Sequence, residues 1–297
     1  MAQLVECVPN FSEGRRPEII REILAQIVQV KGVKLLDHSS DPSHNRSVVT
    51  FLGDPQGVKE AAFQTVKKAA ELIDLDQHQG EHPRMGATDV VPFIPVSGVS
   101  MEECVDMARE VGKRIGTELG IPVYLYEAAA SRPERKNLAQ VRKGQYEGLK
   151  TAIKEPDRHP DFGPAELPRA GATAVGARPP LVAYNINLDT DRVEIAQTIA
   201  KAIRGSSGGF PSIKALGIRI EETNRAQVTI NVCNYREVPL HRVFEIVKTE
   251  AARYGVQVLN SEIVGLTPME ALIDAAGFYL RLENFAEKQI LEKRIME

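Results

Sequence analysis

Hydrophobic residues follow two different periods along the first hundred positions of the chain. Two stretches that begin at Pro17 and Pro55 carry apolar residues at intervals of three and four, which predicts helices. Four other stretches alternate apolar and polar residues or are apolar throughout, which predicts strands at 4–8, 33–37, 47–52 and 90–96. The resulting order, strand, helix, strand, strand, helix, strand, is that of the ferredoxin-like βαββαβ fold, in which two helices cover one face of an antiparallel sheet.

The middle of the chain is predicted to be less regular. Polar residues 38–46 are expected to form a loop between two strands. Ser100 and Glu103 have the spacing of a capping box and predict a helix, which a strand at 121–126 follows. Residues 132–154 are predicted as an excursion of short helices. Residues 155–180 hold six prolines and three glycines, which predicts a long segment without regular structure. Such segments are usually linkers or functional loops.

The opening pattern of apolar positions returns after residue 180. Strands are predicted at 181–188, 213–221, 226–233 and 257–264, with helices from 193 and 239. We therefore expect an α/β (α+β) protein of two ferredoxin-like subdomains, residues 1–180 and 181–297, whose sheets face across a substrate cleft. The tail after Pro268 has apolar residues at helical spacing and is predicted to be a C-terminal helix or a subunit interface.

Composition narrows the class of protein. The 297 residues are 43% hydrophobic, enough for a folded core, and the formal net charge is -3. Without a basic run interleaved with aromatic residues, no nucleic-acid binding is expected. Cys7, Cys104 and Cys233 are too widely spaced for a zinc motif or a disulfide framework. The sequence shows neither a signal peptide nor an apolar run of roughly 18 residues, so we expect a cytoplasmic protein that does not enter a membrane.

The richest chemistry lies in the polar loop before the strand at 90–96. An imidazole can both accept and return a proton near neutral pH, so His82 is the candidate general acid/base. Glu81 and Asp89 could orient or tune its ring, and Arg84 could clamp a carboxylate. The alternative is that a lone histidine before a proline is simply a loop or capping residue.

Two groups of residues have the spacing of metal ligands. His78 and His82 are four apart, but the glycine and proline around them oppose a helix. His38, Asp41 and His44 could be ligands on a loop, yet the residues between them equally suit an exposed connection. We expect no metal site. Phosphate-loop and serine-hydrolase motifs are absent from the sequence.

Four arginines are placed in or beside predicted loops. Each is individually more typical of an exposed charge than of a ligand clamp. Gathered near His82, they would suit a substrate that is rich in carboxylates. They are Arg46, Arg84, Arg169 and Arg178.

Several motifs, in this order along the chain, resemble the glutamate formimidoyltransferase (glutamate formiminotransferase) family. The resemblance runs over the whole sequence. The motifs are Val5-Glu6-Cys7-Val8-Pro9-Asn10-Phe11-Ser12-Glu13-Gly14, Gly80-Glu81-His82-Pro83-Arg84-Met85-Gly86-Ala87, Pro92-Phe93-Ile94-Pro95-Val96, Pro122-Val123-Tyr124-Leu125-Tyr126, Asp161-Phe162-Gly163-Pro164, Gly171-Ala172-Thr173-Ala174 and Tyr184-Asn185-Ile186-Asn187.

The resemblance implies a reaction and its participants. Members of this family transfer the formimino group of N-formimino-L-glutamate to N5 of tetrahydrofolate, a co-substrate, without a metal. They are homodimers. Because this chain lacks the cyclodeaminase domain of vertebrate members, a separate cyclodeaminase is expected to act on the product.

The resemblance also assigns roles to residues of this chain. His82 matches the catalytic histidine. Ser39 stands where vertebrate members carry an acidic residue, so Asp37 or Asp41 is expected to supply that carboxylate. The residues expected to bind substrate are Asn10, Asp37, Arg46, Arg84 and Arg178. The segment that matches the folate-binding loop is Gly163, Pro164, Ala165, Glu166, Leu167, Pro168, Arg169, Ala170, Gly171 and Ala172.

Two alternative functions stay open. One is a sibling transferase that uses N-formylglutamate or formiminoglycine as donor. The sequence does not separate these donors, because recognition of one carboxylate more or less is decided by side-chain placement. A noncatalytic folate-binding protein would have the same fold without using His82 as a proton relay.

Overall fold

The structure of the chain is a computed structural model that describes residues 2–221 and 223–296. It forms two compact units, Met1–Pro179 and Pro180–Glu297. Each unit has its own sheet and its own hydrophobic core. The α+β class predicted from the sequence is confirmed. The prediction that the two sheets face one another across a cleft stays a prediction.

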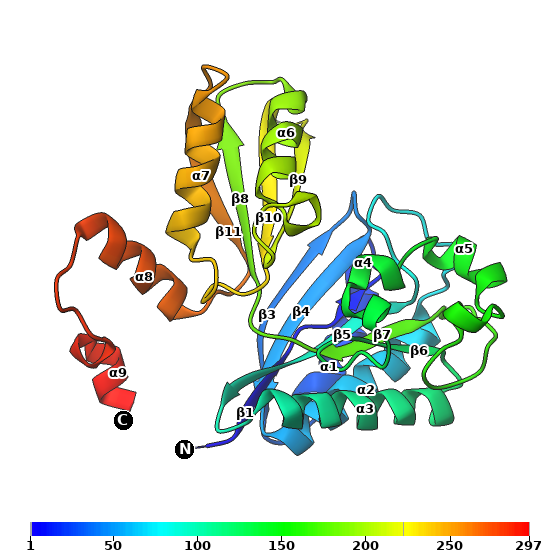
Figure 1. The fold of residues 1–297 in the computed structure, drawn as a ribbon. Coiled ribbons are helices and arrows are strands. Elements are labelled where there is room, and N and C mark those ends of the chain that lie inside the picture. Colours follow the sequence, from blue (N-terminus) through cyan, green and yellow to red (C-terminus); the bar gives the residue numbers. More distant parts are fainter. Residues whose placement is uncertain (1, 222, 297) are drawn as a thin grey trace. The chain divides into compact units, whose positions relative to one another are not determined.

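The first unit is built on a mixed sheet (Figure 1). Its elements are β1 (Leu4–Cys7), β2 (Asn10–Phe11), α1 (Pro17–Val28), β3 (Val33–Asp41), β4 (Arg46–Gly53), α2 (Pro55–Leu72), β5 (Thr88–Ser97), α3 (Met101–Glu118), β6 (Val123–Glu127), η1 (Pro133–Lys136), α4 (Leu138–Val141), α5 (Gln145–Ala152), η2 (Pro156–Arg158) and β7 (Thr173–Ala177).

Four strands of this sheet have the ferredoxin-like order. They lie as β3-β4-β1-β5, and each neighbouring pair is antiparallel. Strand β2 pairs with both β4 and β5, while β7 and then β6 extend the sheet in parallel from β5. The βαββαβ unit is therefore followed by a parallel extension, which needs the crossover helix α3.

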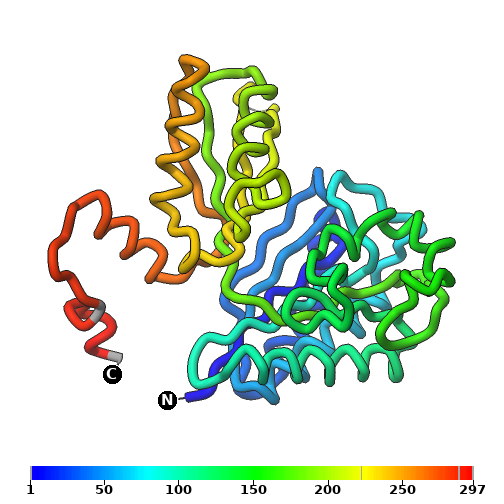
Figure 2. Tube along the Cα trace, viewed as in Figure 1, coloured from blue at the N-terminus to red at the C-terminus, as the bar shows by residue number. Residues whose placement is uncertain are grey.

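Helices pack on both faces of the sheet (Figures 1 and 2). Helices α1, α2 and α3 bury their apolar stripes in one core, around the fully buried Ile23, Phe51 and Phe93. The short helices α4 and α5 cover a second core around Tyr124 and Leu149. Strands β5, β7 and β6 are thus enclosed on two sides, and the segment 128–172 reaches the loop that carries His82.

Two sequence predictions about this unit are wrong. The expected loop at 38–46 is shorter, because β3 continues to Asp41 and pairs with β4 through its backbone despite its polar side chains. The segment 155–180 contains strand β7, all five residues of which are buried. A strand covered on both faces shows no alternation of polar and apolar residues, so its period gave no signal.

Ser100 caps helix α3 as predicted, and loss of its hydroxyl is expected to lower the stability of the protein. The Ser100 hydroxyl accepts the Glu103 amide hydrogen, while the Glu103 carboxylate accepts that of Ser100. Replacing Ser100 with alanine is expected to lower the free energy of unfolding by about 1 kcal/mol. Urea unfolding measures the change, and an unaltered midpoint would contradict it. Ser206→Ala, at an exposed position outside any helix cap, is a reference for the loss of a serine hydroxyl.

The second unit repeats the ferredoxin-like order with the sheet β11-β8-β10-β9. The prediction of a duplicated pattern is confirmed for these elements. They are β8 (Val182–Leu188), α6 (Val193–Ile203), η3 (Gly205–Ser207), β9 (Ile213–Ile220), β10 (Arg225–Val232), α7 (Leu240–Ala252) and β11 (Val258–Val264), followed by α8 (Met269–Leu280), η4 (Glu287–Gln289) and α9 (Leu291–Met296). Within the described ranges, no helix has the length and apolarity that a bilayer crossing requires.

Candidate active site

The segment after β1 supports the loop that carries His82. The Ser12 amide donates to the Ala87 carbonyl at 2.9 Å, and the Ser12 hydroxyl donates to the Gly86 carbonyl at 2.8 Å. The buried Glu13 carboxylate accepts the amides of Arg15 and Arg16, both at 2.9 Å. The segment is therefore held at both ends.

The β3–β4 turn supports the same loop from another side. Asn45 adopts a left-handed conformation, with φ of 48°, which asparagine tolerates better than most residues. Its side-chain amide accepts from Gly14 and donates to the Gln79 carbonyl, both at 2.9 Å. The Asn45 carbonyl lies 2.9 Å from the His78 ring nitrogen Nε2. This one residue thus joins the turn to the segments before α1 and before His82.

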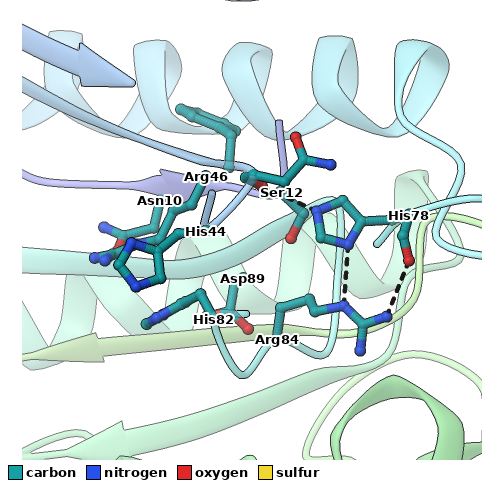
Figure 3. Close-up of a pocket in the computed structure, with 10 residues that line it drawn as sticks. Asn10, Ser12, His44, Arg46, His78, His82, Arg84 and Asp89 are labelled. Carbon is teal, nitrogen blue, oxygen red and sulfur yellow. Dashed lines mark hydrogen bonds between the residues drawn. The ribbon is translucent and has the colours of Figure 1, made fainter. Parts of the chain in front are cut away.

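A small cavity forms where these three segments meet (Figure 3). About 190 Å³ of space, part of it open to solvent, lies among its side chains. The side chains around it are polar except for Phe11. They belong to Asn10, Phe11, Ser12, His44, Asn45, Arg46, His78, His82, Arg84 and Asp89. Asn10, Arg46, Arg84 and His82, all predicted from the sequence, therefore share one site.

The His82 imidazole is held neutral in this site. Burial, followed by the positive charges of Arg46 and Arg142 and the neighbouring His44, lowers the pKa of His82 to about 3. Its buried Nε2 has no hydrogen-bond partner in the described part of the chain. A neutral ring with an uncommitted nitrogen is able to accept a proton from a bound molecule.

The low pKa of His82 makes stability depend on pH. Because its ordinary pKa is 6.5 and the folded value is about 3, the unfolded chain binds a proton between these values that the folded chain does not. Stability is thus fully retained above pH 6.5 and falls as the pH drops toward 3, by at most about 1.4 kcal/mol per pH unit. Urea unfolding between pH 7 and 4 is expected to show a shallower decline for His82→Gln. Equal slopes would refute this.

Arg46 presents a cation to the cavity. Its Nε donates to the Asn10 side-chain oxygen at 2.9 Å, and its Nη2 contacts the same oxygen. Among the residues that the structure describes, no carboxylate lies within ion-pair distance of its guanidinium. Burial, with the charge of Arg142, lowers the pKa of Arg46 to about 10, so it stays protonated at neutral pH. This charge can bind an anion.

Arg84 differs from Arg46 because its guanidinium is fully engaged within the protein. Its Nη1 and Nη2 donate to the two Glu147 oxygens at 2.8 and 2.6 Å, and its Nε donates to the His78 Nδ1 at 3.1 Å. The Arg84 hydrogen bonds hold the pKa of Glu147 at about 2. This geometry favours a role for Arg84 in holding the loop.

Two further predicted residues lie outside the cavity. Asp37 is half-buried on β3, paired in register with Thr50 of β4. Arg178 follows β7, where its amide donates to the Phe93 carbonyl at 3.1 Å and its Nη1 to the Pro179 carbonyl at 3.0 Å. Of Asp37 and Asp41, it is Asp41 that contacts a cavity residue, His44. The roles predicted for Asp37 and Arg178 stay predictions.

The C-terminal end of the segment 163–172 lies against the His82 loop. The Ala87 amide donates to the Ala170 carbonyl at 2.7 Å, and the Ala172 amide donates to the Met85 carbonyl at 2.9 Å. Residues 170–172 are buried by this contact, while Gly163, Pro164, Glu166 and Arg169 are exposed and Ala165, Leu167 and Pro168 are half-buried. The predicted folate segment thus has one end fixed to the predicted catalytic loop.

Sequence reasoning missed the contribution of the short helices. Asp89 accepts the Met85 amide at 2.9 Å through one carboxylate oxygen and contacts the Arg142 guanidinium through the other. Asp89 therefore holds the loop rather than the His82 ring. Arg142 and Glu147 lie in the stretch 132–154, which was predicted as short helices, but no local signal indicated that they contact the His82 loop.

Among residues 2–221 and 223–296, no group of three or more histidine, cysteine or acidic side chains is arranged to hold a metal ion. His78 and His82, four apart in sequence, both line the cavity, but His78 is bound to Asn45 and Arg84.

Known proteins resemble this chain along both units. Residues 4–178 match the formiminotransferase domain, N-terminal subdomain, and residues 183–296 match the formiminotransferase domain. A glutamate formimidoyltransferase of Streptococcus pyogenes serotype M1 is 54% identical over 100% of both chains. One of Thermoplasma acidophilum is 52% identical over 98% of this chain and 97% of its own. The formimidoyltransferase-cyclodeaminase of Mus musculus is 47% identical over 96% of this chain, which covers 54% of that protein.

Proposed function

Because this chain belongs to the formiminotransferase family in both of its units, we propose that it transfers the formimino group of N-formimino-L-glutamate to N5 of tetrahydrofolate, giving 5-formiminotetrahydrofolate and L-glutamate. The observation that supports this most directly is His82, whose Nε2 has no partner in a cavity that it shares with Arg46. An uncommitted base beside a half-buried cation suits proton transfer on an anionic substrate.

The reaction needs one proton to move between two nitrogens. N5 attacks the formimino carbon, the C=N π pair moves to the terminal nitrogen, and His82 accepts the proton that N5 loses. The tetrahedral intermediate then collapses, the bond from carbon to the glutamate nitrogen breaks, and that nitrogen gains a proton. A positioned acid/base contributes about 10²–10⁴-fold, and alignment of the two substrates contributes up to roughly 7–11 kcal/mol.

The folate co-substrate is assigned to the segment 163–172. The proximity of this segment to the His82 loop supports the assignment, since the Ala170 and Ala172 backbones bond directly to residues 87 and 85.

The function is tested by product analysis. The purified chain is incubated with tetrahydrofolate and N-formimino-L-glutamate, N-formyl-L-glutamate or formiminoglycine, and L-glutamate and 5-formiminotetrahydrofolate are measured. Turnover is expected with N-formimino-L-glutamate. Faster turnover with another donor would make the chain a sibling transferase, and binding of folate without turnover on any donor would make it a folate-binding protein.

Arg46 is the residue proposed to hold a carboxylate of the donor. Replacing it with methionine is expected to raise the KM for N-formimino-L-glutamate about 10–100-fold with little change in kcat, because a hydrogen bond to a charged group contributes about 1.5–3 kcal/mol. Steady-state kinetics with the donor varied measures this effect. Arg84→Met is the matched comparison. An equal rise in KM with an unchanged urea midpoint would give Arg84 the substrate-binding role predicted from the sequence, and a lowered midpoint would show that it holds the loop.

The tail supports the proposal of a homodimer. Leu272, Phe278, Leu280, Leu291 and Ile295 of α8 and α9 are between 47% and 75% exposed, an apolar surface that a second copy of the chain would cover. Light scattering during size-exclusion chromatography is expected to give twice the monomer mass.

A further inference from the structure

A second imidazole lies at the edge of the cavity that holds His82. The ring centroids of His44 and His82 are 6.1 Å apart, with an interplanar angle of 86° (Figure 3). His44 belongs to the β3–β4 turn, and its side chain is 47% exposed. One ring is therefore half-buried and the other is open to solvent, at the same site.

Asp41 holds the His44 ring in place. One Asp41 oxygen lies 2.7 Å from His44 Nδ1, and the other accepts the amides of Ser43 and His44 at 2.8 and 2.9 Å. Burial would raise the pKa of Asp41, but the His44 and Ser43 hydrogen bonds together hold it below its usual value, so the carboxylate is ionised. An ionised acceptor keeps a proton on Nδ1 and leaves Nε2 to act on another molecule.

The two imidazoles have opposite surroundings. His82 lies near the cations Arg46 and Arg142, which disfavour its protonated form. The Nδ1 of His44 instead lies 2.7 Å from a carboxylate oxygen of Asp41. A ring among cations and a ring beside a carboxylate are two different electrostatic settings at one site, which suits them to separate roles.

We propose that His44 is a second catalytic residue, the general acid that protonates the departing glutamate nitrogen, and that Asp41 is its positioning residue. The inference rests on the proposed function. It divides the transfer of one proton from N5 to the glutamate nitrogen between two rings. His82 takes the proton from N5. As the carbon–nitrogen bond to glutamate breaks, the bond pair stays on nitrogen, which receives the proton of the His44 imidazolium.

The cycle balances without another reactant. After one turnover His82 carries the extra proton and His44 is neutral. The proton returns from His82 to His44 across the short gap between the rings through water, or each ring exchanges with solvent. The net change is one proton moved from N5 to the amine that leaves, as the overall reaction requires.

The basicity of the leaving amine tests this division. Turnover of wild type and His44→Gln is compared on N-formimino-L-glutamate and on N-formimino-4,4-difluoro-L-glutamate, whose amine is less basic and needs less help to leave. With the natural donor, His44→Gln is expected to lower kcat about 10²-fold, within the usual contribution of a general acid. With the fluorinated donor, the deficit is expected to shrink to a few-fold.

Three further variants separate chemistry from structure. His82→Gln is expected to be equally impaired on both donors, because its step precedes departure of the amine. Asp41→Asn is expected to lower kcat less than His44→Gln and to show the same partial rescue. His38→Gln, in the same hairpin but outside the cavity lining, is expected to behave as wild type.

The outcomes distinguish the two levels of the proposal. A His44→Gln variant with wild-type kcat on the natural donor overturns the role of His44. A deficit that is equal on both donors also overturns it, because it would show a positional rather than an acid role. A wild type that transfers nothing from either donor overturns the proposed function itself, and this inference with it.

Discussion

Replacing His82 with glutamine is expected to reduce kcat for formimino transfer about 10²–10⁴-fold. Glutamine keeps a polar side chain of similar reach but cannot accept the proton that N5 must lose. The dissociation constant of folate is expected to change little, because the predicted folate segment contacts the His82 loop through the backbones of residues 85 and 87. Single-turnover kinetics, with folate binding followed by calorimetry, separates these two effects.

The exposed His159 offers a matched control for His82. His159→Gln also removes an imidazole, and its turnover is expected to equal that of the wild type. If His82→Gln kept full turnover, the ring would not be the proton acceptor, and the bulk solvent or His44 would have to take its place. Loss of folate binding together with turnover would instead indicate that the variant disturbs the loop.

Gly171→Ala is expected to lower the free energy of unfolding by roughly 2–5 kcal/mol and to weaken folate binding. Gly171 has a φ of +70°, which an L side chain rarely adopts. A Cβ there would lie 2.3 Å from the Met85 carbonyl oxygen, a backbone atom that cannot move without shifting the His82 loop. The substitution is therefore expected to push the predicted folate segment away from the His82 loop.

Urea unfolding and folate calorimetry measure the effect of this change. Gly208→Ala is the comparison, since Gly208 also has a positive φ but a Cβ there meets nothing within 4 Å. Gly208→Ala is expected to lower the free energy of unfolding only through backbone strain, by about 1–2 kcal/mol. If Gly171→Ala were no more destabilised than Gly208→Ala, the close contact with Met85 would contribute nothing to stability.

The accuracy of the fold prediction followed the strength of the local signals. Ser100 and Glu103 predict their cap correctly because the capping box involves residues only three apart. The two βαββαβ units were recognisable because most of their helices and strands bury one side and so keep a clear period, while β5, enclosed on both sides, is a continuous apolar run. The strand Thr173–Ala177 was missed because neighbouring elements cover both of its faces.

The accuracy of the site prediction depended on distance along the chain. His82 and Arg46 stand out as chemically capable side chains, and the structure places both on one cavity. The Arg84 guanidinium, predicted to meet a substrate, is engaged by Glu147, which lies 63 residues away. No local pattern indicates a partner at such a distance.

The amino-acid order alone was sufficient to predict the repeated fold class, the family resemblance and the candidate acid/base, because periodicity, caps and long motifs are properties of neighbouring residues. Only the folded chain revealed that His44 lies beside His82 with Asp41 behind it, and that Arg84 is engaged by Glu147. The physical reason is that the charge, burial and orientation of a side chain depend on segments that folding brings together from distant parts of the sequence.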